Sequence, residues 1–152
     1  MGTEIERKFL VKSNDYRKLA KPVKIQQGYL CTDPEKTVRV RVYGKKAFLT
    51  IKGKVVNLSR PEFEYKIPVD DALSILKLCK NTIWKKRYKI NYGDHLWEVD
   101  EFLRENKGLI LAEIELSSAD ESFIKPSWIG EEVSQDYRYF NSYLATHPFT
   151  TW

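Results

Sequence analysis

Charged and apolar positions alternate with a period of two residues through much of this chain. In a β-strand, residues two apart point to the same face of the sheet. In the first such segment, Glu4, Glu6 and Lys8 therefore share one face, while Ile5 and Phe9 lie near the other. An ordinary half-buried strand has one apolar face and scattered polar residues on the other. Here one face is almost purely ionic, so both faces of the strand have a defined role.

Further segments with the same alternation follow along the chain, and turn residues such as Gly44, Gly93 and the Asp33-Pro34 pair separate them. It predicts eight strands, because each segment is short, periodic and bounded by a break. The predicted strands are 4–11, 24–31, 37–43, 46–52, 60–67, 84–92, 94–102 and 109–116.

Three further segments have apolar residues at helical spacing. A helix beginning near Asp70 is predicted to be capped by that residue, and a short helix over 14–20 by Ser13. The third helix is predicted at 134–146. Strands joined by short hairpins favour an antiparallel sheet, and eight are enough to close a barrel. We therefore expect an α+β fold in one domain over 1–152: an eight-stranded antiparallel closed β-barrel with helices packed on the outside.

The next question is which face of each strand points into the barrel. If the apolar faces pointed inward, the amphipathic helices would have little apolar surface on which to pack. If the charged faces point inward, the outer wall is apolar and the helices can cover it. The second arrangement uses every predicted element, and it creates a charged interior.

Eight acidic and eight basic residues have this inward parity. The acids are Glu4, Glu6, Glu62, Glu64, Glu98, Asp100, Glu113 and Glu115, and the bases are Lys8, Arg39, Arg41, Lys52, Lys66, Lys85, Arg87 and Lys89. Burying an unpaired ion costs several kcal/mol, so one reading is a lattice of ion pairs that neutralises itself.

However, the charges are segregated by strand. Arg39 and Arg41 form a basic pair, whereas Glu113 and Glu115 form an acidic one. Like charges side by side resist burial unless a counter-ion lies between them. Carboxylates favour a hard divalent cation such as Mg²⁺ or Mn²⁺, and arginine suits phosphate oxygens. A metal ion together with a polyphosphate would satisfy both groups.

Composition narrows the possible partners. The chain has 152 residues, a formal net charge of +5 and 31% charged residues, which favours anionic partners in general. Cys31 and Cys79 form no motif and are expected to be reduced thiols, typical of a cytoplasmic protein. No apolar run approaches about 18 residues, so no membrane span is expected. The charged N-terminus also argues against a secretory signal.

The ordered set of charged strands resembles the CYTH superfamily, the triphosphate tunnel metalloenzymes. Its N-terminal ExExK signature is matched by Glu4-Ile5-Glu6-Arg7-Lys8. The likeness continues, in the expected order, in Thr37-Val38-Arg39-Val40-Arg41, Thr50-Ile51-Lys52, Glu62/Glu64, Lys85-Lys86-Arg87, Glu98/Asp100 and Glu113-Ile114-Glu115. The family fold is an eight-stranded antiparallel tunnel. The compact size resembles the small bacterial members, many of which hydrolyse inorganic triphosphate.

Charge and this likeness together imply the roles of the site residues. Glu4, Glu6 and Glu115 are expected to hold the Mg²⁺ or Mn²⁺ ion that grips the triphosphate, and with Lys8 they are the predicted catalytic set. A second group is expected to hold another metal or to orient the basic residues: Glu62, Glu64, Asp100 and Glu113. The expected phosphate contacts are Lys8, Arg39, Arg41, Lys52, Lys85 and Arg87. Tyr29 and Arg138 are weaker candidates.

Several alternatives remain at this point. On the same fold, the activity could be that of an adenylate cyclase, a thiamine-triphosphatase or a nucleoside-triphosphatase. In another class, the chain could be a non-catalytic module that binds polyphosphate or RNA. We expect a small-molecule triphosphate as the partner, with neither membrane nor nucleic acid, and the sequence leaves a homodimer open. The run from Lys85 to Lys89 also has a rival reading as a basic surface.

Overall fold

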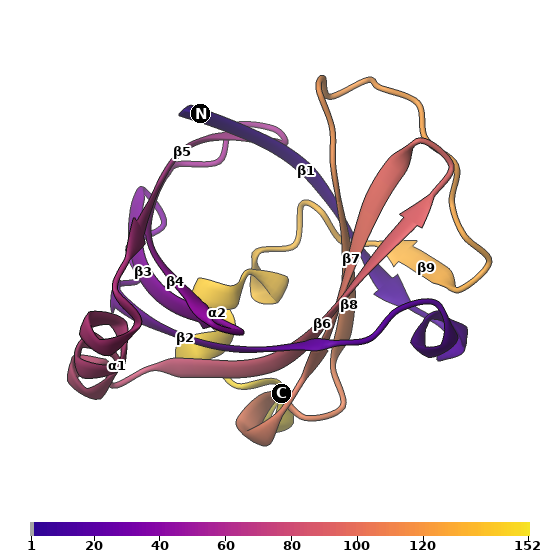
Figure 1. The fold of residues 1–152 in the computed structure, drawn as a ribbon. Helices are drawn as coiled ribbons and strands as arrows, with labels where there is room; N and C mark the ends of the chain where they lie inside the picture. The colour runs from indigo at the N-terminus through magenta and orange to yellow at the C-terminus, as the bar shows by residue number, and fades with distance from the viewer. Residues whose placement is uncertain (1) are drawn as a thin grey trace.

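The computed structural model describes residues 2–152, and its main feature is a closed barrel of eight antiparallel strands (Figure 1). These strands confirm the eight predicted ones, with ends that shift by no more than two residues. Their bounds are β1 Gly2–Val11, β2 Val23–Cys31, β3 Lys36–Tyr43, β4 Lys46–Gly53, β5 Ser59–Ile67, β6 Thr82–Tyr92, β7 His95–Phe102 and β8 Ile110–Glu115.

The barrel closes through strand β1. The strand order is β5-β4-β3-β2-β6-β7-β8-β1, and β1 pairs back onto β5, with Gly2 opposite Glu62 and Ile5 opposite Ser59. A ninth strand, β9 (Ile129–Glu132), adds to the far end of β1. It was not predicted, because four residues are too few to show an alternating pattern.

Helix α1 (Val69–Leu78) covers the outer face of β3 and β4, as predicted for an amphipathic helix. Its Ala72 and Leu76 pack against Val40 and Ala47 on the barrel wall.

The predicted capping residues of two helices are wrong. The residue before α1 is Pro68, whose fixed backbone starts the helix without a side-chain cap. Asp70 lies in the first helical turn, where its charge favours the positive end of the helix dipole. The segment predicted at 14–20 is only a 3₁₀ turn, Asp15–Lys18, and it follows Asn14. Ser13 donates instead to the carboxylate of Asp15.

The C-terminal helix is also shorter than the predicted 134–146. Helix α2 spans Asn141–Thr146, and a 3₁₀ turn, Tyr137–Tyr139, precedes it. Asp136 accepts a hydrogen bond from the backbone N–H of Arg138 and so nucleates that separate turn. Phe140 is extended, with φ −71° and ψ 135°, and this conformation interrupts any continuous helix.

Apolar packing occurs on both sides of the barrel wall. Outside β1 and β6–β8, a large cluster around Phe9, Trp97 and Trp128 is covered by β9 and the 3₁₀ turn at Asp15–Lys18. A second cluster includes inward-parity residues such as Ile83 and Leu111. It packs against helix α2 through the fully buried Leu144. Helix α2 lies near one end of the ring of strands (Figure 1). That end of the barrel is therefore filled by apolar side chains.

Within residues 2–152, none of the helices is both long and apolar enough to traverse a lipid bilayer.

Candidate active site

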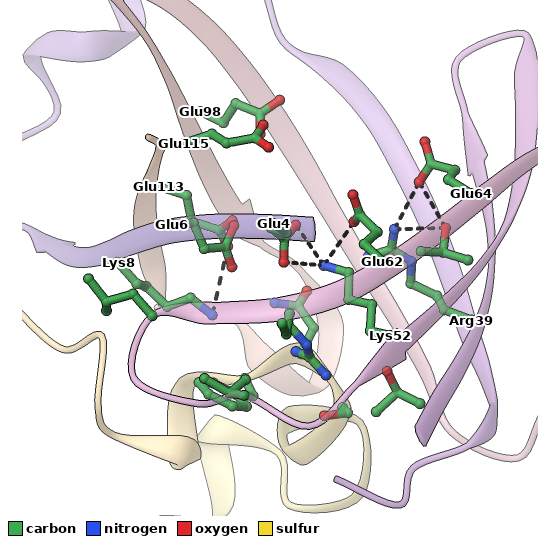
Figure 2. Close-up of a pocket in the computed structure, with 18 of the residues that line it drawn as sticks. Glu4, Glu6, Lys8, Arg39, Lys52, Glu62, Glu64, Glu98, Glu113 and Glu115 are labelled. Atoms are coloured by element: carbon green, nitrogen blue, oxygen red, sulfur yellow. Dashed lines mark hydrogen bonds and ion pairs between the residues drawn. The ribbon is translucent and has the colours of Figure 1, made fainter. Parts of the chain in front are cut away.

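The charged faces of the strands surround a cavity of about 230 Å³ inside the barrel (Figure 2). Of the thirteen residues predicted for catalysis, phosphate contact or metal binding, all but one line it, so the charged faces point inward as expected. The predicted residues at the cavity wall are Glu4, Glu6, Lys8, Arg39, Arg41, Lys52, Glu62, Glu64, Lys85, Arg87, Glu113 and Glu115. Glu98 lines the cavity as well.

Strand register creates a wall of carboxylates. Glu6 on β1 lies opposite Glu115 on β8, and Glu98 on β7 lies opposite Glu113 on β8. Like charges in such positions repel. The pKa of Glu6 is raised well above its ordinary value, because the carboxyl is buried and because Glu113 and Glu4 lie close by.

Other carboxyl groups of this wall respond to the same two effects. Burial raises the pKa of Glu115, and Glu4 and Glu98 add to the increase. Burial and Glu4 likewise raise the pKa of Glu62. These crowded acids hold their protons more tightly than an isolated carboxyl group does, and a cation between them would relieve the repulsion.

Lysines occupy part of the acidic wall. The Nζ of Lys52 lies 3.1 Å from both carboxylate oxygens of Glu4 and 3.4 Å from Oε2 of Glu62. The Nζ of Lys8 lies 3.7 Å from Oε1 of Glu113. Burial alone would raise the pKa of Glu113, but Lys8 is the largest of the opposing effects, which lower it to about 2.

Arg39 and Arg41 form a basic wall on β3. Their Nη2 atoms lie 3.6 Å and 3.7 Å from the same oxygen of Glu64, which also accepts a 2.8 Å hydrogen bond from Thr50. Among residues 2–152, the buried Nε atoms of both arginines have no hydrogen-bond partner. Burial, together with the charges of Arg39 and Arg87, lowers the pKa of Arg41 to about 10. This wall therefore has donors and positive charge available for an anion.

Asp100 is the predicted site residue that does not line the cavity. Its two oxygens accept 2.8 Å and 2.9 Å hydrogen bonds from the guanidinium of Arg87, and Lys85 Nζ lies 2.8 Å away. Burial would raise the pKa of Asp100, but Arg87 and Lys85 outweigh it and lower the pKa well below the ordinary range. The geometry thus favours the orienting role over metal ligation for this carboxylate.

Two polar residues that the sequence did not single out, Asn141 and the buried Gln27, form a hydrogen-bonded group with Lys85 and Tyr29 at the cavity wall. Oδ1 of Asn141 on α2 accepts hydrogen bonds from Lys85 Nζ at 2.8 Å and from Gln27 Nε2 at 3.1 Å. Gln27 also donates to the hydroxyl of Tyr29, which lines the cavity. The strand parity of Gln27 could have placed it inside, whereas nothing in the spacing of Asn141 distinguished it.

The other candidates lie away from the cavity or at its edge. Arg138 is exposed, pairs with Asp136 at 2.6 Å and does not line the cavity. Lys66 is exposed, and the side chain of Lys89 is 49% exposed beside Glu98. Lys86, which has the opposite parity, is exposed as expected.

The donor set suits a hard divalent cation, since it consists of carboxylate oxygens. Within residues 2–152, no three acidic, histidine or cysteine side chains already stand together as a metal site. Lysine ammonium groups hold Glu4, Glu62 and Glu113 instead. Metal binding here would therefore require these ion pairs to rearrange.

The comparison with known proteins agrees with this barrel and its charged lining. The CYTH domain model matches residues 2–146. This chain belongs to the CYTH family. An inorganic triphosphatase of Acetivibrio thermocellus is 52% identical over 151 residues, covering 98% of this chain and 97% of that protein. An inorganic triphosphatase of Nitrosomonas europaea is 38% identical over 148 residues, covering 94% of this chain and 97% of that protein.

A solved structure supports the fold of this CYTH chain. The crystal structure of an inorganic triphosphatase superimposes on it with a TM-score of 0.68 and 35% identity, covering 93% of this chain and 96% of the other. The structural likeness therefore extends over almost the whole of both chains.

Proposed function

We propose that this protein is an inorganic triphosphatase, which hydrolyses triphosphate to pyrophosphate and phosphate with the help of Mg²⁺ or Mn²⁺. The observation that carries the proposal is the cavity inside the barrel, in which a carboxylate wall faces arginines and lysines. The names of the two close relatives support the same substrate.

The basic residues would bind and orient the triphosphate. Arg39 and Arg41 offer planar guanidinium groups, and their Nε donors have no partner among the described residues. Lys8, Lys85 and Arg87 reach the cavity from β1 and β6. Together they would spread positive charge around the phosphoryl oxygens, where negative charge must be stabilised during transfer.

The acidic residues would hold the cation. Glu4, Glu6 and Glu115 are the proposed ligands of the ion that contacts the triphosphate, with Glu62, Glu64 and Glu113 as support for a second ion. When bound, the cation supplies charge neutralisation on the phosphates and a lowered pKa for the attacking water.

The proposed reaction needs no covalent nucleophile on the protein. A water oxygen attacks a terminal phosphorus in line with the bridging oxygen, and the bond from that phosphorus to the bridging oxygen breaks. The protons of the attacking water end on oxygens of the product phosphate and pyrophosphate or pass to solvent, and pyrophosphate is the leaving group. The barrel wall is a medium of lower dielectric constant than water, which strengthens the action of the lining charges on the phosphates.

The test is a phosphate-release panel with triphosphate, pyrophosphate, ATP, GTP and thiamine triphosphate, each with Mg²⁺ and with Mn²⁺. We expect release to be fastest from inorganic triphosphate and to vanish when the cation is chelated. Glu6→Ala and Glu115→Ala should abolish turnover, whereas Glu35→Ala on the exposed surface should not.

The same panel separates the alternatives. Formation of cyclic AMP and pyrophosphate from ATP would identify a cyclase, and preference for a nucleotide or thiamine triphosphate would identify one of the other phosphatases. If no metal-dependent release occurs with any substrate while triphosphate still binds, the chain is a binding module and the proposal is wrong.

A further inference from the structure

Lys52 bridges glutamates of two neighbouring strands, β1 and β5, on the cavity wall. Its Nζ contacts both oxygens of Glu4 on β1 at 3.1 Å and one oxygen of Glu62 on β5 at 3.4 Å (Figure 2). The side chains of Lys52 and Glu4 are only 16% and 10% exposed. The lysine is therefore held inside the barrel, at the seam where β1 closes onto β5.

The position of this ammonium is fixed by the sheet rather than by chance proximity. Lys52 and Glu62 are direct partners in the β4–β5 ladder, and Glu62 lies opposite Gly2 in the β5–β1 ladder. The seam thus delivers carboxylates from two strands to a single lysine. A charge of +1 stands where the acidic wall would hold a divalent cation.

The ammonium of Lys52 is also expected to contact the phosphates of bound triphosphate. Lys52 lines the cavity together with Arg39, Arg41 and the other phosphate-binding residues. One Nζ cannot hold two carboxylates at full strength while it grips a phosphate. Lysine can move between the two positions, because its charge is compact and its four-carbon stem is flexible.

We propose that Lys52 is an exchangeable counter-ion: it neutralises Glu4 and Glu62 in the metal-free protein, a divalent cation displaces it, and its ammonium then turns to the triphosphate. This inference rests on the proposed metal-dependent function. It makes Lys52 a link between the two binding events, because the cation that takes its carboxylates also releases it for phosphate.

The first test measures Mn²⁺ binding in the absence of triphosphate, from the electron paramagnetic resonance signal of the free ion. Lys52→Met and Lys52→Gln remove the competing charge, so Mn²⁺ affinity should increase on the order of tenfold, within the range of typical coupling between sites. Lys52→Arg keeps the charge and should remain within a few-fold of wild type. Lys89→Met is the matched control, since Lys89 is half exposed and lies 3.9 Å from Glu98.

Unchanged or weaker Mn²⁺ binding by the neutral Lys52 variants overturns the inference, because a lysine that only contacts phosphate does not compete with the metal. Mn²⁺ affinities are compared only among variants that unfold cooperatively on heating, because these variants are folded.

A second measurement uses the unmodified protein and stays informative if the variants do not fold. Nitrogen-15 spectra of the lysine ammonium groups are recorded while Mg²⁺ is added without triphosphate. The Lys52 resonance should shift and its hydrogen exchange should accelerate as the ion pairs with Glu4 and Glu62 are lost. If Mg²⁺ binds and this resonance does not change, the inference is wrong.

These binding measurements can be told apart from the test of the proposed function. Metal exchange at Lys52 without turnover of triphosphate would contradict the proposed activity alone. Turnover with no effect of Lys52 on metal affinity would contradict the counter-ion role alone. Absence of any metal binding would contradict both.

Discussion

At the scale of single residues, the lining of the barrel is a set of charges whose partners decide their roles. Asp100 illustrates this best, because both its oxygens are engaged by Arg87 and Lys85 behind the cavity wall. Removing one member of a buried ion pair leaves an uncompensated charge, which is far more costly than losing an exposed pair. Asp100 therefore holds two cationic side chains in place without lining the cavity itself.

We expect Asp100→Asn to lower the free energy of unfolding by about 3–5 kcal/mol and to weaken triphosphate binding, because Arg87 and Lys85 lose their common anion. Thermal unfolding and KM report the two effects. Asp136→Asn is the control, since Asp136 pairs with the exposed Arg138 and should cost less than about 1 kcal/mol. An equal effect of both variants would refute the positioning role.

The pH dependence of this effect has a definite sign. Burial raises the pKa of Asp100, but Arg87 and Lys85 lower it by more, so the folded-state pKa lies below the unfolded value. The stability that Asp100 contributes is therefore complete above its ordinary pKa of about 4 and is lost as the pH falls below that value. The Tm difference between wild type and Asp100→Asn should shrink on acidification. A constant difference down to about pH 2 would argue against this assignment.

Asn141, on helix α2, is expected to position Lys85, one of the proposed phosphate-binding residues. Asn141→Ala removes the acceptor that Lys85 and Gln27 share, so Lys85 should become less well placed and KM for triphosphate should rise more than kcat falls. Steady-state kinetics separate the two parameters. Thr146→Ala, an exposed change at the end of the same helix, serves as the control. A fall in kcat with unchanged KM would contradict this role.

At the scale of elements, strand alternation predicted the eight strands, and the need for the amphipathic helices to pack on apolar strand faces predicted that the charged faces point inward. The pattern at Glu4, Glu6 and Lys8 is unambiguous, because side-chain direction in a strand depends only on parity. Helix ends were less predictable. Pro68 rather than Asp70 starts α1, and a local hydrogen bond at Asp136 replaces the first half of the expected C-terminal helix. Such ends depend on single backbone conformations, which periodicity does not encode.

In the candidate site, too, strand parity predicted some residues and could not predict others. All thirteen predicted residues lie on strands, and twelve of them line the cavity; Asp100 shares their parity, but its oxygens are bound by Arg87 and it does not line the cavity. Asn141 reaches the site from a helix packed across the barrel end. Its placement depends on tertiary contacts of α2, and these are invisible in the local sequence pattern.

Gly28 fixes how closely α1 approaches the barrel. A Cβ at this position would lie 2.8 Å from the Cβ of Cys79 and 3.0 Å from a methyl group of Leu76. We expect Gly28→Ala to push the end of α1 outward and to cost about 1–3 kcal/mol, as overpacking generally does. Thermal unfolding measures it, and Leu78→Ala on the exposed side of α1 is the control. An unchanged Tm would show that the helix is not tightly seated.

At the scale of the whole molecule, the barrel concentrates carboxyl groups whose pKa values are raised. Burial is the first cause for Glu6, Glu62 and Glu115, and neighbouring carboxylates are the second. A cation that binds to such a wall must displace any protons held there. The site and the solution pH are therefore linked.

We expect the affinity for Mg²⁺ to increase with pH through the range above the ordinary carboxyl pKa of about 4.3 and to level off once the wall is fully ionised. Calorimetry in two buffers with different ionisation heats should detect proton release on binding. Glu6→Gln should reduce that release. Binding with no proton release at mildly acidic pH would contradict the raised pKa values.

The apolar filling around Leu144 has one more consequence for the whole molecule. Because these side chains fill one end of the barrel, the cavity within residues 2–152 has an opening at the other end only. Triphosphate would then enter and both products leave through the same opening. A pyrophosphate that dissociates slowly would block binding of the next triphosphate. The turnover rate would therefore depend on the rate of product release as well as on the rate of phosphoanhydride hydrolysis.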